Sequence, residues 1–306
     1  MNYWLEVAVT CDGEAAEAVA ELLRPLAHGN SVVLEQLGAP GVPEVDALEP
    51  QLTVKIFLPE EHDTPHVRRK IQEALYYLGR LYPIPEPAFR KLEDRDWAEA
   101  WKERYEPFRV GDRFWIRPSW ADVEGPVEAD DIVLTLDPGM AFGTGLHPTT
   151  QMCLRALERL VQPGMHVLDV GTGSGILAIA SAALGAAHVR AIDTDPQAAT
   201  AARENVERNE VAHLVNVRLG SLDLVERQDW DVVIANILAP VIITMLRQDD
   251  LFNYVTANKG RLLLSGMIDR QVPDVAAAVS EAGGSISERL TVRDWVTVIA
   301  LRGDRG

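Results

Sequence analysis

The sequence of 306 residues is short of cysteine, of aromatic residues and of positive charge. Its two cysteines, Cys11 and Cys153, lie far apart and lack the paired spacing of a disulfide framework or a zinc site. Lysine and arginine number 29 against 46 acidic residues, which gives a formal net charge of −17. Because nucleic-acid binding normally requires a basic patch, this balance argues against a general phosphate-binding surface. It is compatible with a basic protein partner attracted by charge, and equally with solubility alone.

Long apolar runs are also missing. No run reaches the ~18 residues that are needed to cross a bilayer. The first residues, 1–6, lack the basic segment and apolar stretch that are typical of a secretory signal. We therefore expect a cytoplasmic monomer without membrane contact. Apolar residues make up 47% and charged residues 25% of the chain, the balance of a globular protein with room for about two domains.

The first part of the chain alternates short strands with helices. The patterns predict strands at 3–9, 31–37, 52–58 and 88–92, and helices at 14–26 and 64–81. This β-α-β-β-α-β order predicts a ferredoxin-like domain. A charged segment punctuated by proline follows and is the candidate linker. The predicted division is a ferredoxin-like domain at 1–83, a linker with a short helix (96–102) at 84–110, and a larger domain at 111–306.

From Thr149 onward, longer helices alternate with short and nearly continuous apolar strands. Such strands suit a parallel sheet that is covered on both faces. The last stretch, 285–300, predicts two strands that meet at Arg293. The predicted fold is therefore a doubly wound, mostly parallel sheet with a C-terminal antiparallel hairpin. The predicted strands are 165–170, 188–192, 216–219, 232–235 and 262–264, and the predicted helices are 176–184, 196–209, 240–255 and 272–282.

A glycine-rich turn follows the first predicted strand of this sheet, with Gly171, Gly173 and Gly175 before a helix. Glycines let the backbone turn sharply and approach a ligand, here at the strand end where open α/β sheets bind ligands. Alone, such a turn is a weak indication. A dinucleotide-binding turn needs a small residue where this sequence has Ile176. The pattern therefore favours S-adenosylmethionine over a nicotinamide dinucleotide.

Two further strand ends carry polar side chains. Asp193 ends the next strand about twenty residues on, where a carboxylate can accept both hydroxyls of a ribose. Its alternative role is to cap the helix that follows, although Asp195 suits that role better. Asn236 ends the strand 232–235, and its amide oxygen could accept a hydrogen bond from an incoming amine. Asn236 could also cap the following helix, and both roles can hold at once.

A glycine-containing loop at 137–150 precedes the core sheet. Its length without regular structure favours a functional role, and it could fold over a cofactor with Phe142 as an apolar wall. Pro148 begins a helix, which places Thr150 in the first turn. His147 could belong to the site or only cap this helix, and the sequence does not choose between these roles.

Four segments resemble the bacterial methyltransferases that modify large-subunit ribosomal protein L11. They are residues 136–150, 168–180, 192–196 and 235–238, and the resemblance covers essentially the whole chain. It implies a class I methyltransferase domain behind a ferredoxin-like recognition domain, with S-adenosylmethionine as the cofactor. It also implies trimethylation of lysine ε-amines and of the N-terminal α-amine of the ribosomal protein.

The resemblance and the motifs together indicate a set of site residues. Asn236 is the predicted catalytic residue, which orients the amine, while no general base and no metal site can be named. Thr172 stands where the family often has Cys, which we expect to be harmless because the backbone forms the turn. Glu210 stands where Gly is commoner, in a turn far from the chemistry. The predicted cofactor-binding residues are Phe142, Thr144, Thr150, Gly171, Gly173, Asp193 and Asn236.

Three other functions remain open from the sequence. The chain could be a class I methyltransferase that acts on another protein or on a small molecule. It could be a nicotinamide-dependent enzyme, or a binding module without catalysis.

Overall fold

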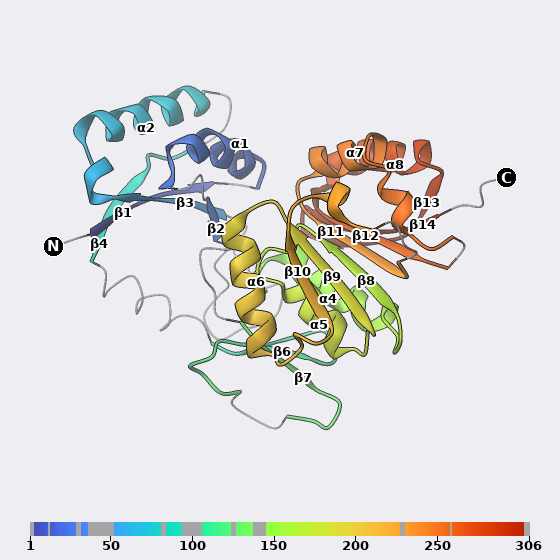
Figure 1. Ribbon diagram of the computed structural model, residues 1–306. Helices are drawn as coiled ribbons and strands as arrows, with labels where there is room; N and C mark the ends of the chain where they lie inside the picture. Colours follow the sequence, from blue (N-terminus) through green and yellow to red (C-terminus); the bar gives the residue numbers. More distant parts are fainter. Residues whose placement is uncertain are drawn as a thin grey trace. The chain divides into compact units, whose positions relative to one another are not determined.

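The computed structural model describes residues 3–11, 13–28, 32–35, 52–80, 84–93, 106–123, 127–136, 145–226, 230–257 and 259–302. The chain forms two compact units, Met1–Glu106 and Pro107–Gly306 (Figure 1). The helix predicted at 96–102 lies outside the described residues, as does part of the strand predicted at 31–37.

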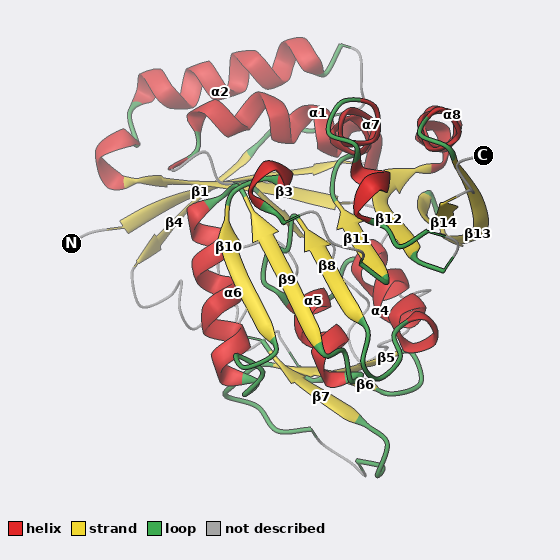
Figure 2. Ribbon diagram, turned by 45° about the vertical axis from the view of Figure 1, so that its right-hand side comes forward, coloured by secondary structure: helices red, strands yellow, loops and turns green. Residues whose placement is uncertain are grey.

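The first unit is a four-stranded antiparallel sheet with two helices on one face (Figure 2). In the first strand the buried residues Leu5, Val7 and Val9 alternate with more exposed neighbours, as expected when one face packs on helices. The sheet order is β2-β3-β1-β4, and the element order is the predicted β-α-β-β-α-β. Along the chain these elements are β1 (Tyr3–Cys11), α1 (Gly13–Leu23), β2 (Val33–Glu35), β3 (Leu52–Pro59), α2 (Pro65–Leu78) and β4 (Ala88–Glu93).

The second unit contains a seven-stranded sheet in the order β10-β9-β8-β11-β12-β14-β13. The first five strands in this order are parallel, and β14 runs antiparallel to both of its neighbours. The predicted doubly wound sheet with a C-terminal hairpin is therefore confirmed. The strands are β8 (His166–Val170), β9 (His188–Asp193), β10 (Val215–Leu219), β11 (Val232–Asn236), β12 (Arg261–Ile268), β13 (Gly284–Val292) and β14 (Trp295–Arg302).

Helices cover both faces of this sheet, which explains why its central strands are apolar on both sides. In β11, for example, residues 232–235 are all buried. Helices α4, α5 and α6 lie on one face, and α7 and α8 pack together on the other (Figure 2). Their bounds are α4 (Pro148–Leu160), α5 (Ile176–Ala183), α6 (Pro196–Arg208), α7 (Ala239–Arg247) and α8 (Val272–Glu281).

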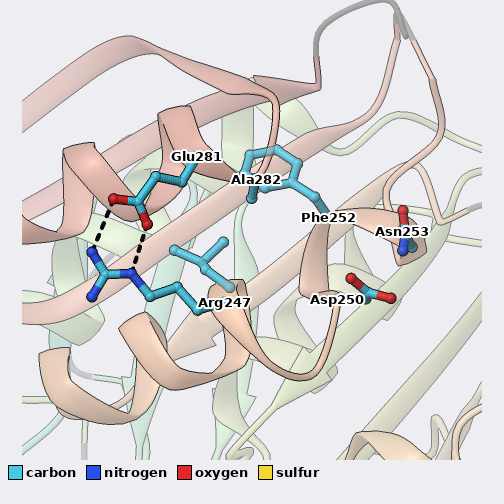
Figure 3. Close-up of a pocket in the computed structure, with 7 residues that line it drawn as sticks. Arg247, Asp250, Phe252, Asn253, Glu281 and Ala282 are labelled. Carbon is cyan, nitrogen blue, oxygen red and sulfur yellow. Dashed lines mark hydrogen bonds and ion pairs between the residues drawn. The ribbon is translucent and has the colours of Figure 1, made fainter.

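The single helix predicted at 240–255 is wrong. Helix α7 ends at Arg247, and a short 3-10 helix, Leu251–Tyr254, follows. Between them Asp250 has a φ of 56°, a left-handed conformation that no α-helix continues through. Arg247 then reaches α8, where its Nε and Nη2 atoms donate to the two carboxylate oxygens of Glu281 at 2.7 and 3.1 Å (Figure 3). The cavity beside this ion pair, about 280 Å³ in volume, contains none of the predicted site residues.

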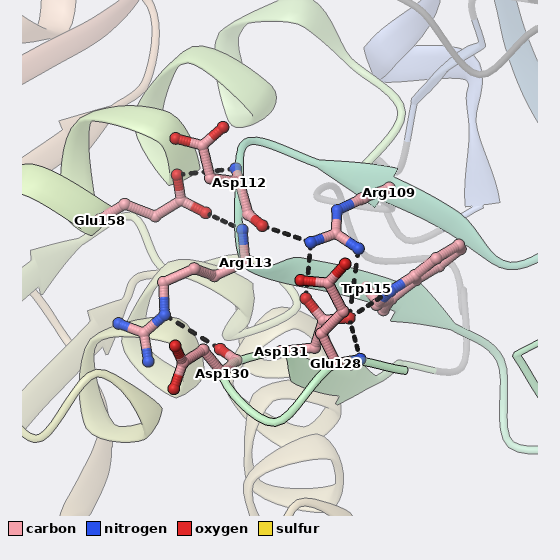
Figure 4. A network of polar contacts seen from close by, with 8 residues as sticks. All are labelled: Arg109, Asp112, Arg113, Trp115, Glu128, Asp130, Asp131 and Glu158. Atoms are coloured by element: carbon pink, nitrogen blue, oxygen red, sulfur yellow. Dashed lines mark hydrogen bonds and ion pairs between the residues drawn. The ribbon is translucent and has the colours of Figure 1, made fainter. Parts of the chain in front are cut away.

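A small three-stranded sheet precedes the seven-stranded one in the chain. It consists of β5 (Phe108–Val110), β6 (Phe114–Arg117) and β7 (Ile132–Thr135), in that order. The carboxylate of Asp131 connects its strands, because it accepts hydrogen bonds from Arg109 on β5, from the Trp115 indole on β6 and from the Glu128 amide (Figure 4). Within the described ranges, no helix is long and apolar enough to cross a membrane.

Candidate functional site

The glycine turn between β8 and α5 needs glycine at all three positions. Gly171, Gly173 and Gly175 have φ angles of 72°, 57° and 84°, which a residue with a Cβ adopts only with strain. A Cβ on Gly171 would also lie 2.3 Å from the side chain of Ile237. A Cβ on Gly175 would lie 3.2 Å from Ala202 of α6. Because Gly171 has no side chain, the segment that follows β11 can pack against the turn. Because Gly175 has none, helices α5 and α6 can approach each other closely.

Asp193 holds this turn from the end of the neighbouring strand β9. Its Oδ2 accepts a hydrogen bond from the Gly173 amide, and its Oδ1 accepts one from the Asp195 amide, both at 2.9 Å. Each carboxylate oxygen can accept a further bond, so the group retains acceptors for a ligand. Asp195, as predicted, is the residue that caps α6, because its Oδ1 accepts from the Gln197 amide at 2.8 Å.

Asn236 ends β11, the strand on the other side of β8. Its Nδ2 donates to the hydroxyl of Thr150, a buried residue in the first turn of α4, at 3.4 Å. Its Oδ1 is buried and accepts no hydrogen bond from the part of the chain that the structure describes. The alternative role of Asn236 as a helix cap is wrong, because α7 begins later and Leu238 is at its N-cap.

The segment after Asn236 is fixed between two glycines. Ile237 lies against Gly171 on one side, and its carbonyl lies 2.3 Å from where a Cβ on Gly266 would be. Gly266 has a φ of 84° and sits in an irregularity of β12 between Leu264 and Met267. These close approaches position Asn236, and the sequence motifs gave no direct sign of them.

His147, whose role the sequence left open, caps α4. Its Nδ1 accepts from the Thr149 amide at 3.3 Å and lies 2.6 Å from the Thr149 hydroxyl oxygen. Its ring stands edge-on to Trp295 with 4.6 Å between the ring centroids. Burial lowers the pKa of His147 to about 4, so the ring is neutral near pH 7.

Asp169 is a polar group of this region that the sequence reasoning missed. It lies in β8, two residues before the turn, and is 1% exposed. The Thr172 hydroxyl donates to its Oδ2 at 2.6 Å, so the side chain of Thr172 does more than the backbone role expected of it. An acidic residue within a buried apolar strand was the available signal, since buried carboxylates are rare without a specific role.

The structure thus gathers five of the predicted cofactor-binding residues at the carboxyl ends of three adjacent strands. The turn residues follow β8, the Asp193 carboxylate ends β9, and the Asn236 amide, which donates to Thr150, ends β11. Phe142 and Thr144 lie outside the described residues. The five are Thr150, Gly171, Gly173, Asp193 and Asn236.

A doubly wound sheet with one reversed strand next to its edge, and a glycine turn and acid at its ligand-binding end, define a class I methyltransferase. The chain belongs to the ribosomal protein L11 methyltransferase family, whose sequence model (PrmA) matches residues 3–303.

Individual relatives agree with this assignment. The chain is 42% identical to the ribosomal protein L11 methyltransferase of Chloroflexus aurantiacus, over 98% of each chain. It is 38% identical to the protein of the same name from Geobacillus kaustophilus, over 98% of this chain and 99% of the relative. The crystal structure of ribosomal protein L11 methylase from Lactobacillus delbrueckii subsp. bulgaricus superposes with a TM-score of 0.60 at 32% identity, covering 65% of this chain and all of that one.

Proposed function

We propose that this protein transfers methyl groups from S-adenosylmethionine to amino groups of ribosomal protein L11. The observation that carries the chemistry is the buried Oδ1 of Asn236, which has no partner among the described residues and lies at the strand end beside the glycine turn. A buried acceptor without a partner is costly, and a substrate amine would satisfy it. The names of the relatives support the choice of L11 as the target.

The residues present fit a nucleoside that carries a positive sulfonium group. The open acceptors of Asp193 suit the two hydroxyls of a ribose. The backbone of Gly171 and Gly173 carries no side chain that would hinder a close approach. Thr150 and Asn236 present a hydroxyl and an amide near the same strand ends. When bound, S-adenosylmethionine supplies the electrophilic methyl group and the leaving group.

Asn236 orients the incoming amine in this proposal. Its Oδ1 accepts a hydrogen bond from the amine and thereby aims the nitrogen lone pair, a contribution of alignment. The amide cannot take up a proton, so the amine loses a proton to water before each methyl transfer and reacts as the neutral base. A lysine amine with a pKa of ~10.4 is only ~0.04% neutral at pH 7, which costs about 4.6 kcal/mol, whereas an α-amine near ~7.8 is roughly one-seventh neutral. Burial beside a positive charge lowers the amine pKa and reduces this cost.

We further propose that the targets are lysine ε-amines and the N-terminal α-amine, each methylated up to three times. In this proposal the first unit, Met1–Glu106, recognises the substrate and the second unit, Pro107–Gly306, performs the transfer. Strand β4, which falls within the predicted linker at 84–110, pairs with β1 in the sheet of the first unit. The second unit holds the glycine turn, Asp193 and Asn236, which supports assigning the transfer to it.

Mass spectrometry of L11 tests the proposed function. Purified protein, S-adenosylmethionine and L11 should give L11 heavier by whole methyl groups, located on lysines and on the N-terminus. Asn236→Ala should bind the cofactor but transfer methyl groups at least about 100-fold more slowly, because alignment is lost. Asn216→Ala, at an exposed asparagine of β10, is the matched control and should act as the wild type.

Each failure has its own meaning in this experiment. Cofactor binding without any methyl on L11 would contradict the target, and absence of cofactor binding would contradict the chemistry. Full activity of the Asn236→Ala variant would remove this residue from the reaction.

A further inference from the structure

Asp169 is a buried carboxyl group in β8, two residues before the glycine turn. Its Oδ2 accepts the Thr172 hydroxyl at 2.6 Å. Its Oδ1 is buried and makes no hydrogen bond of ordinary geometry with the described residues, although the Ala178 amide in the first turn of α5 lies near enough to favour the ionised form. A carboxylate in such a position is poorly satisfied, because burial without full hydrogen bonding penalises charge.

The titratable groups around Asp169 do not compensate its charge. They are Asp193 at the end of β9 and the Cys153 thiol of α4. No positive side chain of the described residues is among them. Burial raises the pKa of Asp169 to about 7; the Thr172 hydrogen bond opposes this rise and the Asp193 charge adds to it. The carboxyl is therefore divided between its two protonation states near neutral pH.

We propose that Asp169 loses its proton to solvent when a cationic ligand binds over the glycine turn, and that Thr172 holds the carboxyl in position for this change. The proposal rests on the proposed function, because the cation is the sulfonium group of the cofactor. A positive charge close to a buried carboxyl favours its ionised form. The ionised carboxyl in turn strengthens the binding of the cation, so ligand and proton compete. Thr172 acts through Asp169 and is a positioning residue.

The sign of the pH dependence follows from this competition. Below about pH 7 the free protein holds a proton that the complex does not, so ligand affinity falls as the pH falls. Above the pKa of the free protein no proton remains to be displaced, and the affinity is level. For each unit by which binding lowers the pKa of Asp169, the affinity well below that pKa is about ten-fold lower than its level at high pH.

Titration calorimetry in buffers with different ionisation enthalpies measures the protons released per ligand bound. S-adenosylmethionine is compared with S-adenosylhomocysteine, which has the same nucleoside but no sulfonium charge. The wild type should release a fraction of a proton near pH 7 with the first ligand, and less with the second. Asp169→Asn should remove that proton release. The amine of the ligand can also release protons, but it does so with both proteins, so the difference between them measures the contribution of Asp169.

Variants of Thr172 provide a second test, which holds even if the Asp169→Asn variant does not fold. Thr172→Val removes the donor and should move the pH of maximal release upward, whereas Thr172→Ser keeps the hydroxyl and should restore the wild-type profile. Equal proton release by the wild type and Asp169→Asn would overturn the proposal, as would identical profiles for Thr172→Val and Thr172→Ser. Failure of both ligands to bind the wild type would instead contradict the proposed function.

Discussion

At the scale of single residues, polar side chains lie within an otherwise apolar sheet. Asp169, Asp193 and Asn236 are all at or near the carboxyl ends of strands, and each has a specific polar neighbour. The ends of parallel strands meet at one edge, so groups distant in sequence come together there. This arrangement places two acids and one amide around the glycine turn, whose Thr172 side chain donates to one of the acids.

The buried cap His147 should make the protein sensitive to acid. Its pKa is lowered from 6.5 to about 4, so the unfolded chain binds the proton first and stability falls as the pH falls from about 6.5 to about 4. Asn is also a good N-cap but does not titrate. The His147→Asn variant should therefore lose about 1–2 kcal/mol less stability between pH 7 and pH 5 than the wild type.

Urea unfolding at the two pH values measures this difference. His213→Asn, at an exposed histidine, is the control and should follow the wild type. Asp169 has the opposite effect, because its raised pKa makes the folded state bind the proton first, but it is present in all three proteins. Equal losses of stability for His147→Asn and the wild type would contradict the neutral, buried cap.

Glu210 is a residue whose backbone conformation suits glycine better. It is exposed, lies after α6 and has a φ of 60°. Removing its Cβ relieves about 1–2 kcal/mol of left-handed strain, and the greater freedom of glycine in the unfolded chain offsets part of this gain. Glu210→Gly should therefore raise the free energy of unfolding by about 0.5–1 kcal/mol.

The matched control is the same substitution three residues earlier. Glu207 is exposed within α6, where glycine is unfavourable, so Glu207→Gly should lower the free energy of unfolding by about 1 kcal/mol. Opposite signs in denaturant unfolding would support the assigned backbone conformation, and a loss of stability in both variants would contradict it.

At the scale of elements, the turn between β8 and α5 determines where a ligand can lie. Gly171→Ala introduces both left-handed strain and a Cβ 2.3 Å from Ile237. We expect its affinity for S-adenosylmethionine to fall at least about 100-fold, because displacing the turn or Ile237 by about 1 Å disturbs the site.

Gly164 offers a control for the strain alone. Its φ is 90°, and a Cβ there would meet nothing within 4 Å. Gly164→Ala should cost about 1–2 kcal/mol of stability but leave the affinity for the cofactor intact. Calorimetric titration of both variants measures this, and wild-type affinity in Gly171→Ala would show that the ligand does not depend on the turn.

Most elements of the second unit were predictable because burial on both faces makes each strand a short apolar run. The helix predicted at 240–255 failed for a physical reason. Leu251, Phe252 and Tyr254 are buried, so the apolar pattern continues although the backbone reverses at Asp250. A hydrophobic pattern predicts which residues are buried, but it does not predict the backbone conformation of a single residue such as Asp250.

The candidate site was predictable to a similar extent. A carboxylate or an amide at the end of an apolar strand can be seen in the sequence, which is how Asp193 and Asn236 were found. The contact of Thr172 with Asp169 depends on how the glycine turn folds back over its own strand. The fit of Ile237 against Gly171 and Gly266 depends on β11 lying between β8 and β12, a tertiary arrangement that spacing does not encode.

At the scale of the whole molecule, the chain has two compact units, and both belong to the family match at 3–303. The relatives from Chloroflexus aurantiacus and Geobacillus kaustophilus match over 98% of this chain, so the relationship is not confined to the glycine turn that many methyltransferases share. The net charge of −17 makes the molecule as a whole attractive to a basic substrate through long-range electrostatics.

The central claim is that S-adenosylmethionine lies over the glycine turn with its ribose held by Asp193 and its methyl group near Asn236. A crystal structure of the protein with this compound tests it most directly. We predict that the ribose hydroxyls lie within about 3.2 Å of the Asp193 carboxylate oxygens. A ligand bound elsewhere, or with its hydroxyls turned away from Asp193, would contradict the account.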